Sequence, residues 1–143
     1  MSLFVRSILL LSMLTLGWAK QVNMTITNNL EGNEDLYLHC KSKNNDIGLH
    51  FLHFNQTFGW SFGTQMFWKT LFFCSFKWGN GPLLYYDVYV QLRDFDVCEN
   101  CLWYIHKAGP CRYESCITGS CVRKCYKWNW CVWLQVRNFS WII

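Results

Sequence analysis

Apolar and polar residues alternate most regularly between Met66 and Leu92, on both sides of Gly79–Asn80–Gly81–Pro82. Before this turn, the even positions form a face that is apolar except for one threonine: Met66, Trp68, Thr70, Phe72, Cys74, Phe76 and Trp78. After it, the apolar positions are Leu84, Tyr86, Val88, Val90 and Leu92, while Tyr85, Asp87, Gln91 and Arg93 point the other way. Side chains alternate across a strand, so the pattern predicts a hairpin with one apolar face.

The same alternation limits how the two strands of this hairpin pair. Opposed residues share a face, so their numbers add to an even total, and Cys74 lies opposite either Tyr86 or Val88. A slip by one residue would turn apolar side chains toward water, at a cost of roughly 1.5–3 kcal/mol for each large one. We therefore expect this hairpin to form the core, with Cys74 pointing into it.

Shorter alternating runs predict further strands at residues 21–27, 36–41, 49–54, 60–62 and 101–106. We expect Gln21–Thr27 at a sheet edge, because one of its two faces is fully polar. Four tryptophans fall at predicted core positions: Trp60, Trp68, Trp78 and Trp103. No stretch has a convincing helical period, and short strands between Asn, Gly and Asp clusters are typical of an antiparallel sandwich or barrel.

Composition and charge narrow the class of protein. The chain has 143 residues, of which 52% are apolar and 19% aromatic, so we expect one folded domain and little disorder. The formal net charge is +4, and no run of Arg or Lys is present. A nucleic-acid partner is therefore not expected.

The first residues have the pattern of a secretory leader. Arg6 precedes the apolar run Ile8–Leu16, and Gly17–Trp18–Ala19 places small residues at the two positions that a signal peptidase reads. The run is shorter than the about 20 apolar residues of a membrane-spanning helix, so no stable membrane insertion is expected. We predict a signal peptide at 1–19, one β domain at 20–128, and an apolar tail at 129–143 that is either a covering strand or an artefact of gene prediction.

Secretion into an oxidising compartment makes disulfides the expected state of the nine cysteines. An odd number leaves at least one cysteine that is free, bound to another molecule or in a poorly formed segment. Cys98 and Cys101 have the spacing of a redox pair, and with Cys111 and Cys116 that of a zinc site. A strand pattern follows Cys101 where a redox pair needs a helix, so structural disulfides are favoured over redox catalysis. The secretory leader favours disulfides over the zinc site.

Other candidate sites are few. The four histidines show no sequence signature that joins them to a nucleophile, and no G-x-S-x-G motif is present, so no catalytic residue, metal or cofactor is predicted. Three triplets fit the N-glycosylation pattern, at Asn23, Asn55 and Asn138, and Asn55 is favoured because it lies in a predicted loop.

Several ordered motifs resemble the plant self-incompatibility protein family, the S-protein homologues first known from poppy stigmas. They run from the strand Val22–Thr27 to the closing motif at 125–128. Between these lie Leu38–Lys43, Asp46–Gly48, Trp60–Phe62, Thr70–Trp78, Cys98-x-x-Cys101-x-Trp103 and Gly109–Cys111, and the closing motif is Cys125–Trp128. Each motif is weak alone, but their order and spacing together are specific.

The resemblance implies a small disulfide-stabilised antiparallel β-sandwich that is secreted and acts as a ligand rather than an enzyme. Six cysteines match family positions: Cys40, Cys74, Cys98, Cys101, Cys111 and Cys125. We expect Cys111 to pair with Cys125, and Cys40 and Cys74 to be joined with Cys98 and Cys101 in an order that stays open. Cys116, Cys121 and Cys131 are additional to the family pattern.

These inferences predict a monomeric extracellular protein that binds a cell-surface receptor in pollen–pistil recognition and the rejection of self pollen. Polar loops on such scaffolds carry recognition. The predicted recognition surface is the loop Lys41, Ser42, Lys43, Asn44, Asn45 and Asp46, together with the loop Asp94–Asn100. Two other classes compete with this function: a cationic secreted defence protein acting on membranes or cell walls, which the positive charge and many tryptophans favour, and a hydrolase.

Overall fold

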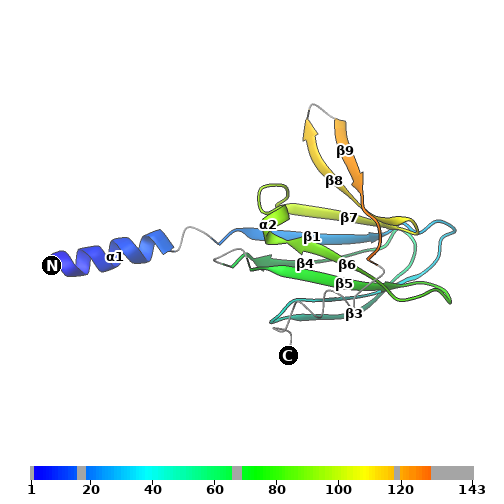
Figure 1. The fold of residues 1–143 in the computed structure, drawn as a ribbon, viewed down its shortest axis with the longest axis horizontal. Helices are drawn as coiled ribbons and strands as arrows, with labels where there is room; N and C mark the ends of the chain where they lie inside the picture. Colours follow the sequence, from blue (N-terminus) through cyan, green and yellow to red (C-terminus); the bar gives the residue numbers. More distant parts are fainter. Residues whose placement is uncertain (1, 16–18, 66–68, 118–119, 130–143) are drawn as a thin grey trace.

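The computed structural model describes residues 2–15, 19–65, 69–117 and 120–129, which form two β-sheets packed face to face (Figure 1). One sheet has five strands in the order β4-β1-β7-β8-β9, and the other has four in the order β3-β2-β5-β6. The elements are α1 (Leu3–Thr15), β1 (Gln21–Asn28), β2 (Leu36–Lys41), β3 (Asp46–Leu52), β4 (Thr57–Gly63), β5 (Leu71–Lys77), β6 (Leu84–Val90), α2 (Gln91–Asp94), β7 (Asn100–His106), β8 (Gly109–Ile117) and β9 (Ser120–Cys125).

This architecture confirms the predicted β-sandwich. All strand pairs are antiparallel except β1 and β7, which run parallel. Helix α1 contains residues 8–15 of the apolar run in the predicted leader and extends away from the two sheets (Figure 1). Among the described residues, no helix has both the length and the apolar character needed to cross a membrane.

The core lies between the inner faces of the two sheets, where the predicted alternation is visible as burial. Val22, Met24 and Ile26 of β1 are buried, and the residues between them are partly or fully exposed. Trp103 of β7 is also fully buried, and its indole Nε1 donates a hydrogen bond to the carbonyl oxygen of Val88 at 2.9 Å. Since β7 and β6 belong to different sheets, this bond links the two layers across the core.

The predicted hairpin is present as β5 and β6, and Cys74 lies opposite Tyr86 with its side chain fully buried. The pairing shifts at a bulge between Phe72 and Cys74, beyond which Phe72 lies opposite Tyr89 and the residue numbers add to an odd total. The prediction that Val90 and Leu92 face inward is therefore wrong.

Beyond the bulge, the inward and outward positions are exchanged. Tyr89 and Gln91 are buried, Val90 is partly exposed, and Leu92 lies in α2 with 78% of its surface exposed. Met66 and Trp68, predicted at the start of the hairpin, lie outside the described residues, and β5 begins at Leu71.

The prediction that Gln21–Thr27 forms an edge strand is also wrong. β1 lies inside the five-stranded sheet, with β4 on one side and β7 on the other. On its polar face Asn23 is exposed in the part of the chain that the structure describes. On the same face, the hydroxyls of Thr27 and Thr57 are hydrogen-bonded at 3.0 Å. A polar face thus indicates that this face of the sheet is open to solvent. It does not indicate whether the strand pairs with one strand or with two.

Three disulfides join Cys40 to Cys74, Cys98 to Cys101 and Cys111 to Cys125. The expectation that Cys40 and Cys74 are joined with Cys98 and Cys101 is wrong, because Cys40 and Cys74 lie opposite each other on the neighbouring strands β2 and β5. Cys98 and Cys101 flank the start of β7 in the other sheet. Cys111 and Cys125 likewise lie opposite each other on β8 and β9.

The described tryptophans pack in or against the core. Trp103 is fully buried, whereas Trp60 and Trp78 are partly buried against it, and Trp68 lies outside the described residues. Trp128 is 5% exposed, with its ring centroid 5.3 Å from that of Phe76 and 5.7 Å from that of Trp78. Trp128 therefore closes one margin of the core just before the tail begins.

Candidate functional site

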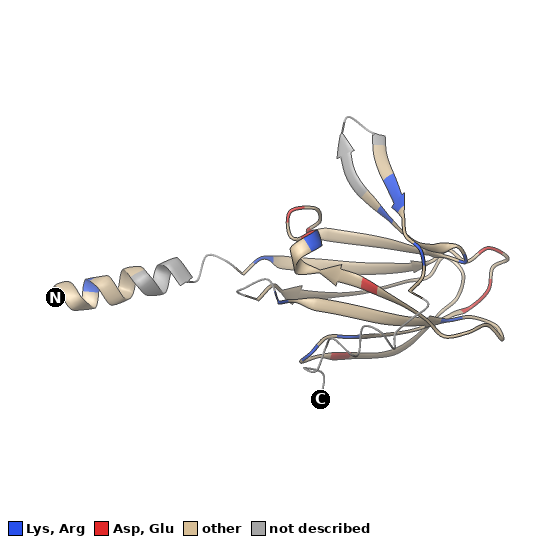
Figure 2. Ribbon diagram, viewed as in Figure 1, with Lys and Arg blue, Asp and Glu red and all other residues tan. Residues whose placement is uncertain are grey.

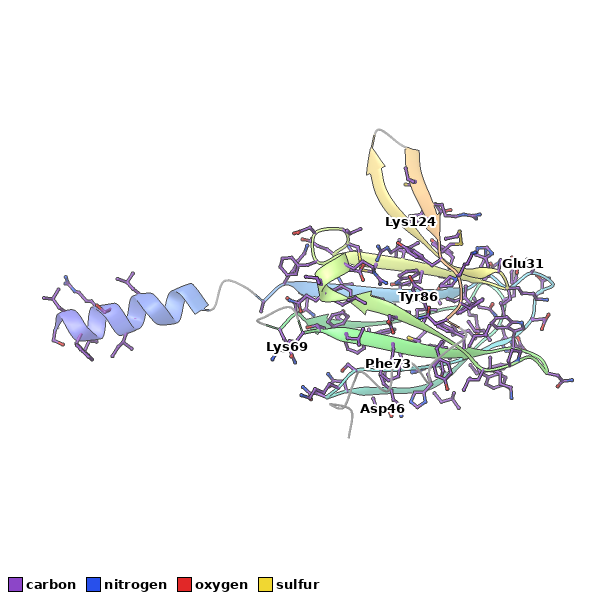
Figure 3. All side chains as sticks on the ribbon, in the orientation of Figure 1. Glu31, Asp46, Lys69, Phe73, Tyr86 and Lys124 are labelled. Atoms are coloured by element: carbon purple, nitrogen blue, oxygen red, sulfur yellow. A yellow bond between two sulfur atoms is a disulfide. The ribbon has the colours of Figure 1, made fainter. Side chains whose placement is uncertain are left out.

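The two loops predicted to carry recognition lie at the same end of the sandwich. Lys41 at the end of β2 lies opposite Phe73 near the start of β5, and Leu71 lies opposite Val90 at the end of β6. The loop after β2 and the segment after β6 therefore leave the sheets at one end, where β1 also begins. Figure 3 shows Lys69 near this end and Glu31 at the opposite end.

The loop Lys41–Asp46 has a fixed base and free tips. The amide of Ser42 donates to the carbonyl of Asn45 at 2.8 Å, and the amide of Asn45 donates to the Ser42 Oγ at 3.1 Å. Lys43, Asn44 and Asn45 are exposed, and no side-chain hydrogen bond or ion pair engages them within the described part of the chain. Their side chains are thus available to a partner while the backbone beneath them is held in one shape.

Asp46 holds the base of this loop to β2. Its carboxylate accepts hydrogen bonds from the His39 Nε2 at 2.6 Å and the Gly48 amide at 2.9 Å, and its other oxygen lies 3.1 Å from the Lys41 Nζ. Gly48 has a φ of +88°, which favours glycine, at the irregular pairing between β2 and β3. The hydrogen bonds from His39, Gly48 and Lys41 together hold the pKa of Asp46 far below its usual range.

This arrangement predicts a pH-dependent contribution to stability. A carboxyl group whose pKa is lower in the folded protein stabilises it above its ordinary value of 3.8, and that stabilisation is lost as the pH falls toward the folded value. We expect Asp46→Asn to lower the melting temperature near neutral pH, and the difference from the wild type to shrink below about pH 4. Melting curves between about pH 2 and pH 7 would measure both.

Asp96→Asn is the matched control, because Asp96 is exposed and has no ion pair among the described residues. We expect its melting temperature to follow the wild type throughout. If the two variants changed stability equally at every pH, the contacts of Asp46 would contribute nothing specific.

The second predicted loop, Asp94–Asn100, is only partly a surface loop. Asp96, Val97, Glu99 and Asn100 are exposed, but the prediction of exposure is wrong for Asp94, whose side chain is fully buried. Two arginines and one backbone amide satisfy this carboxylate. It accepts from Arg93 Nε at 2.7 Å, Arg112 Nη1 at 2.8 Å and the Val90 amide at 2.8 Å. Burial acts to raise the pKa of Asp94, but these hydrogen bonds outweigh it and lower the pKa.

The remainder of this loop is anchored on both sides. The amides of Val97 and Cys98 donate to the carbonyl of Asp94, and Cys98 is bonded to Cys101. Lys20 Nζ donates to the carbonyl of Phe95 at 2.8 Å and lies 3.2 Å from Glu99. Lys20 would be the first residue after cleavage of the predicted leader, so the new chain end would lie beside this loop.

The opposite end holds a polar concavity that the sequence analysis missed. Asn29, Leu30, Glu31, Gly32, Asn33, Phe54 and His106 line a shallow hollow of about 300 Å³. Glu31 joins the β1–β2 loop to the end of β7: its carboxylate lies 3.1 Å from His106 Nδ1 and accepts from the Lys107 amide at 2.9 Å. The acidic loop sequence Glu31–Asp35 was the available signal, but its partners lie more than 70 residues away along the chain.

The groups at this end are engaged with one another. Burial acts to raise the pKa of Glu31, whereas the hydrogen bonds from Lys107 and His106 outweigh it and lower the pKa. Lys107 Nζ also pairs with Glu34, and His53 Nδ1 lies 2.7 Å from Asp35. We interpret these contacts as a connection between loops, because Glu31 and His106, which both line the hollow, contact each other.

The four histidines also contact neighbouring polar groups of the fold. His39, His53 and His106 each contact a carboxylate, and His50 Nε2 lies 2.9 Å from the carbonyl oxygen of Ile47. Within the described ranges, no histidine ring is hydrogen-bonded to a serine hydroxyl or a cysteine thiol; Ser75 Oγ donates only to the backbone carbonyl of His39. The same residues contain no group of three or more His, Cys, Asp or Glu side chains arranged to hold a metal ion.

The candidate glycosylation sites differ in their surroundings. Asn55 is exposed in the turn between β3 and β4, with a φ of +65° and its amide bonded to the carbonyl of Asn28. Asn23 lies within β1, where its Nδ2 donates to Asn100 Oδ1 and its Oδ1 accepts from Ser61 Oγ. Asn138 lies outside the described residues. Asn55 remains the favoured prediction because its side chain projects from a turn.

Comparison with known proteins covers most of the chain. The sequence model of one family, described as "Plant self-incompatibility protein S1", matches residues 23–128. S-protein homolog 19 and S-protein homolog 5 of Arabidopsis thaliana are 39% and 38% identical to this chain over 111 residues. Each match covers 78% of this chain and 79% of the relative.

A solved structure shares the fold. It belongs to the plant Self-Incompatibility Protein Homologue (SPH) proteins, described as a widespread family of small, highly stable, secreted proteins. The TM-score is 0.56 at 19% sequence identity, and the match covers 80% of this chain and 98% of that one.

Proposed function

Because the chain belongs to the plant self-incompatibility protein S1 family, we propose that it is a secreted, non-enzymatic ligand that binds a cell-surface receptor protein on another plant cell. The family is one of small secreted plant proteins, and three disulfides suit the oxidising environment outside the cell. We place the protein in pollen–pistil recognition, where receptor binding would trigger the rejection of self pollen.

The observation that carries this proposal is the loop Lys41–Asp46. Its base is held by the contacts of Asp46 and by the adjacent Cys40–Cys74 bond. Lys43, Asn44 and Asn45 are exposed, and their side chains form no hydrogen bond or ion pair with any residue that the structure describes. A loop held in its bound shape loses less conformational entropy on binding, which favours a binding role for these tips. The exposed part of Asp94–Asn100, at the same end, would extend the contact surface.

The test is direct binding of the mature chain, residues 20–143, to intact plant cells. Labelled protein added to pollen and to leaf protoplasts is expected to bind saturably to at least one of them, and mild protease treatment of the cells is expected to abolish binding. Growth arrest of pollen from particular genotypes only would support the self-incompatibility role.

Comparing cell binding with vesicle binding distinguishes a receptor ligand from a cationic defence protein. A cationic defence protein would bind anionic lipid vesicles and release their contents, and Arg123 and Lys124 on an exposed strand are the structural feature that favours this alternative. Leakage of vesicles at the concentrations that saturate cells, together with binding that survives protease, would contradict the receptor proposal.

A further inference from the structure

The hairpin of β8 and β9 stands away from the sandwich (Figure 1). Pairing between β7 and β8 stops at Trp103 and Arg112, although β8 continues to Ile117. Residues 121–125 of β9 are all exposed, and Val122 has 63% of its surface open to solvent. Five consecutive exposed residues mean that neither face of this strand packs on the other sheet.

Although it projects, the hairpin is covalently cross-linked at its base. Cys111 and Cys125 are bonded at its base, and nearer the tip the backbone register places Cys116 opposite Cys121, which is itself disulfide-bonded. Cys116 and Cys121 are additional to the six cysteines that match the family pattern. This chain thus contains reinforcement of its own in a segment that contributes little to the core.

The base of the hairpin is fixed to the loop Asp94–Asn100. Arg112 is 1% exposed, donates to Asp94 at 2.8 Å and lies with its guanidinium carbon 5.0 Å from the centre of the Trp103 ring. The hairpin therefore projects from beside a loop that the proposed function already uses.

The outer edge of β9 carries positive charge. β9 is the last strand of its sheet, and no described strand pairs with its outer edge. Arg123 forms no ion pair with any described residue, Lys124 has its Nζ 5.4 Å from the Tyr126 ring, and Lys127 follows. β9 contains no acidic residue, whereas Glu114 lies on the neighbouring strand β8. The acidic residues coloured in Figure 2 lie outside the hairpin, in the loops near Glu31, Asp46 and Asp96 and on β6 at Asp87.

We propose that β9 docks an extended acidic segment of a partner protein by strand addition. An exposed edge offers backbone donors and acceptors to an added strand. Basic side chains on that edge repel a basic strand and attract an acidic one, so they select the partner as well as protect the edge. The inference rests on the proposed function in taking a protein as the partner, and it adds the chemistry and geometry of the contact.

A peptide titration tests the proposal without knowledge of the receptor. The probe is a short synthetic peptide that alternates glutamate with threonine, added to isotope-labelled mature protein. We expect backbone amide shifts at Val122, Arg123 and Lys124 and slower hydrogen exchange along β9. The double variant R123E/K124E is expected to bind at least tenfold more weakly, whereas K69E/K77E, which reverses two exposed lysines elsewhere, binds as the wild type does.

Several results would overturn the proposal. These are shifts confined to other strands, no shift at all, equal binding of a peptide with glutamine in place of glutamate, or loss of vesicle binding but not peptide binding in R123E/K124E. An unchanged near-ultraviolet circular dichroism spectrum shows that the variant is folded. Because the probe is not the receptor, failure here leaves binding through Lys41–Asp46 untouched, and failure of cell binding leaves the peptide result intact.

Discussion

Replacing Asp94 with alanine is expected to destabilise the protein by about 3–5 kcal/mol, the range for removing one partner of a buried ion pair. Asp94 is fully buried, and without it the guanidinium of Arg112, 1% exposed, would lose the buried carboxylate that it contacts at 2.8 Å. Domains of this size are typically stable by only about 5–15 kcal/mol, so the loss would be a large share of the total. Urea-induced unfolding of both proteins would measure it.

Two further variants show whether charge is the cause. Asp94→Asn keeps the shape of the side chain and is expected to lose less stability than Asp94→Ala. Adding Arg112→Met to Asp94→Ala removes the buried positive charge that has lost its contact with Asp94, and is expected to recover about half or more of the loss. A loss below about 1 kcal/mol for Asp94→Ala, or no recovery in the double variant, would show that the ion pair is not what holds this region.

Arg112 also explains how the two candidate recognition elements are coupled. Its contact with Asp94 joins the base of the β8–β9 hairpin to α2, and Arg93 stacks within 5.7 Å of the Tyr86 ring on the other side. The exposed residues Asp96, Val97, Glu99 and Asn100 therefore follow a buried charged cluster and not a flexible connection. The Asp94 variants are accordingly expected to disturb both the loop and the hairpin.

Much of the fold could be predicted because apolar and polar residues alternate along strands that have one buried and one open face. β1, β2 and β5 each have one buried and one open face, and the burial of Val22, Leu38 and Cys74 follows directly from that pattern. β8 and β9 were not predicted as strands. Both faces of β9 are exposed, so no apolar alternation was available to mark it.

The errors share a different cause, which is contact between distant residues. The bulge beside Cys74 moves Tyr89 inward because one extra residue is accommodated, and no local pattern marks that position. Asp94 lies in a polar stretch, but it is buried because Arg112, 18 residues later, reaches it. The partner of Cys40 was likewise set by which strands become neighbours.

The loop Lys41–Asp46 could be predicted because its exposure depends on local composition and not on contacts between distant residues. It contains no apolar residue, and such a segment has nothing to bury, so exposure follows from its composition alone. What composition could not provide was the base of the loop, where Asp46 binds His39, Lys41 and the Gly48 amide. That base is why we assign binding to Lys43, Asn44 and Asn45 in particular.

The second large effect is expected at this loop. Replacing Lys43, Asn44 and Asn45 with glycine and serine removes the side chains that are free to contact a receptor, while Asp46 and its partners are kept. Binding to plant cells is expected to weaken at least tenfold, which corresponds to about 1.4 kcal/mol or more. The melting temperature is expected to change little, because these three side chains are exposed and have no hydrogen bond or ion pair to lose within the described structure.

A matched variant at the opposite end controls for surface changes in general. Lys77, Asn80 and Leu83 are exposed around the β5–β6 turn and can be replaced with glycine and serine in the same way. Saturation binding of the wild type and both variants to the same cells is the most direct measurement. Our account predicts a loss of affinity only for the Lys43–Asn45 variant; equal affinity of the wild type and that variant, or a loss only at the β5–β6 turn, would contradict it.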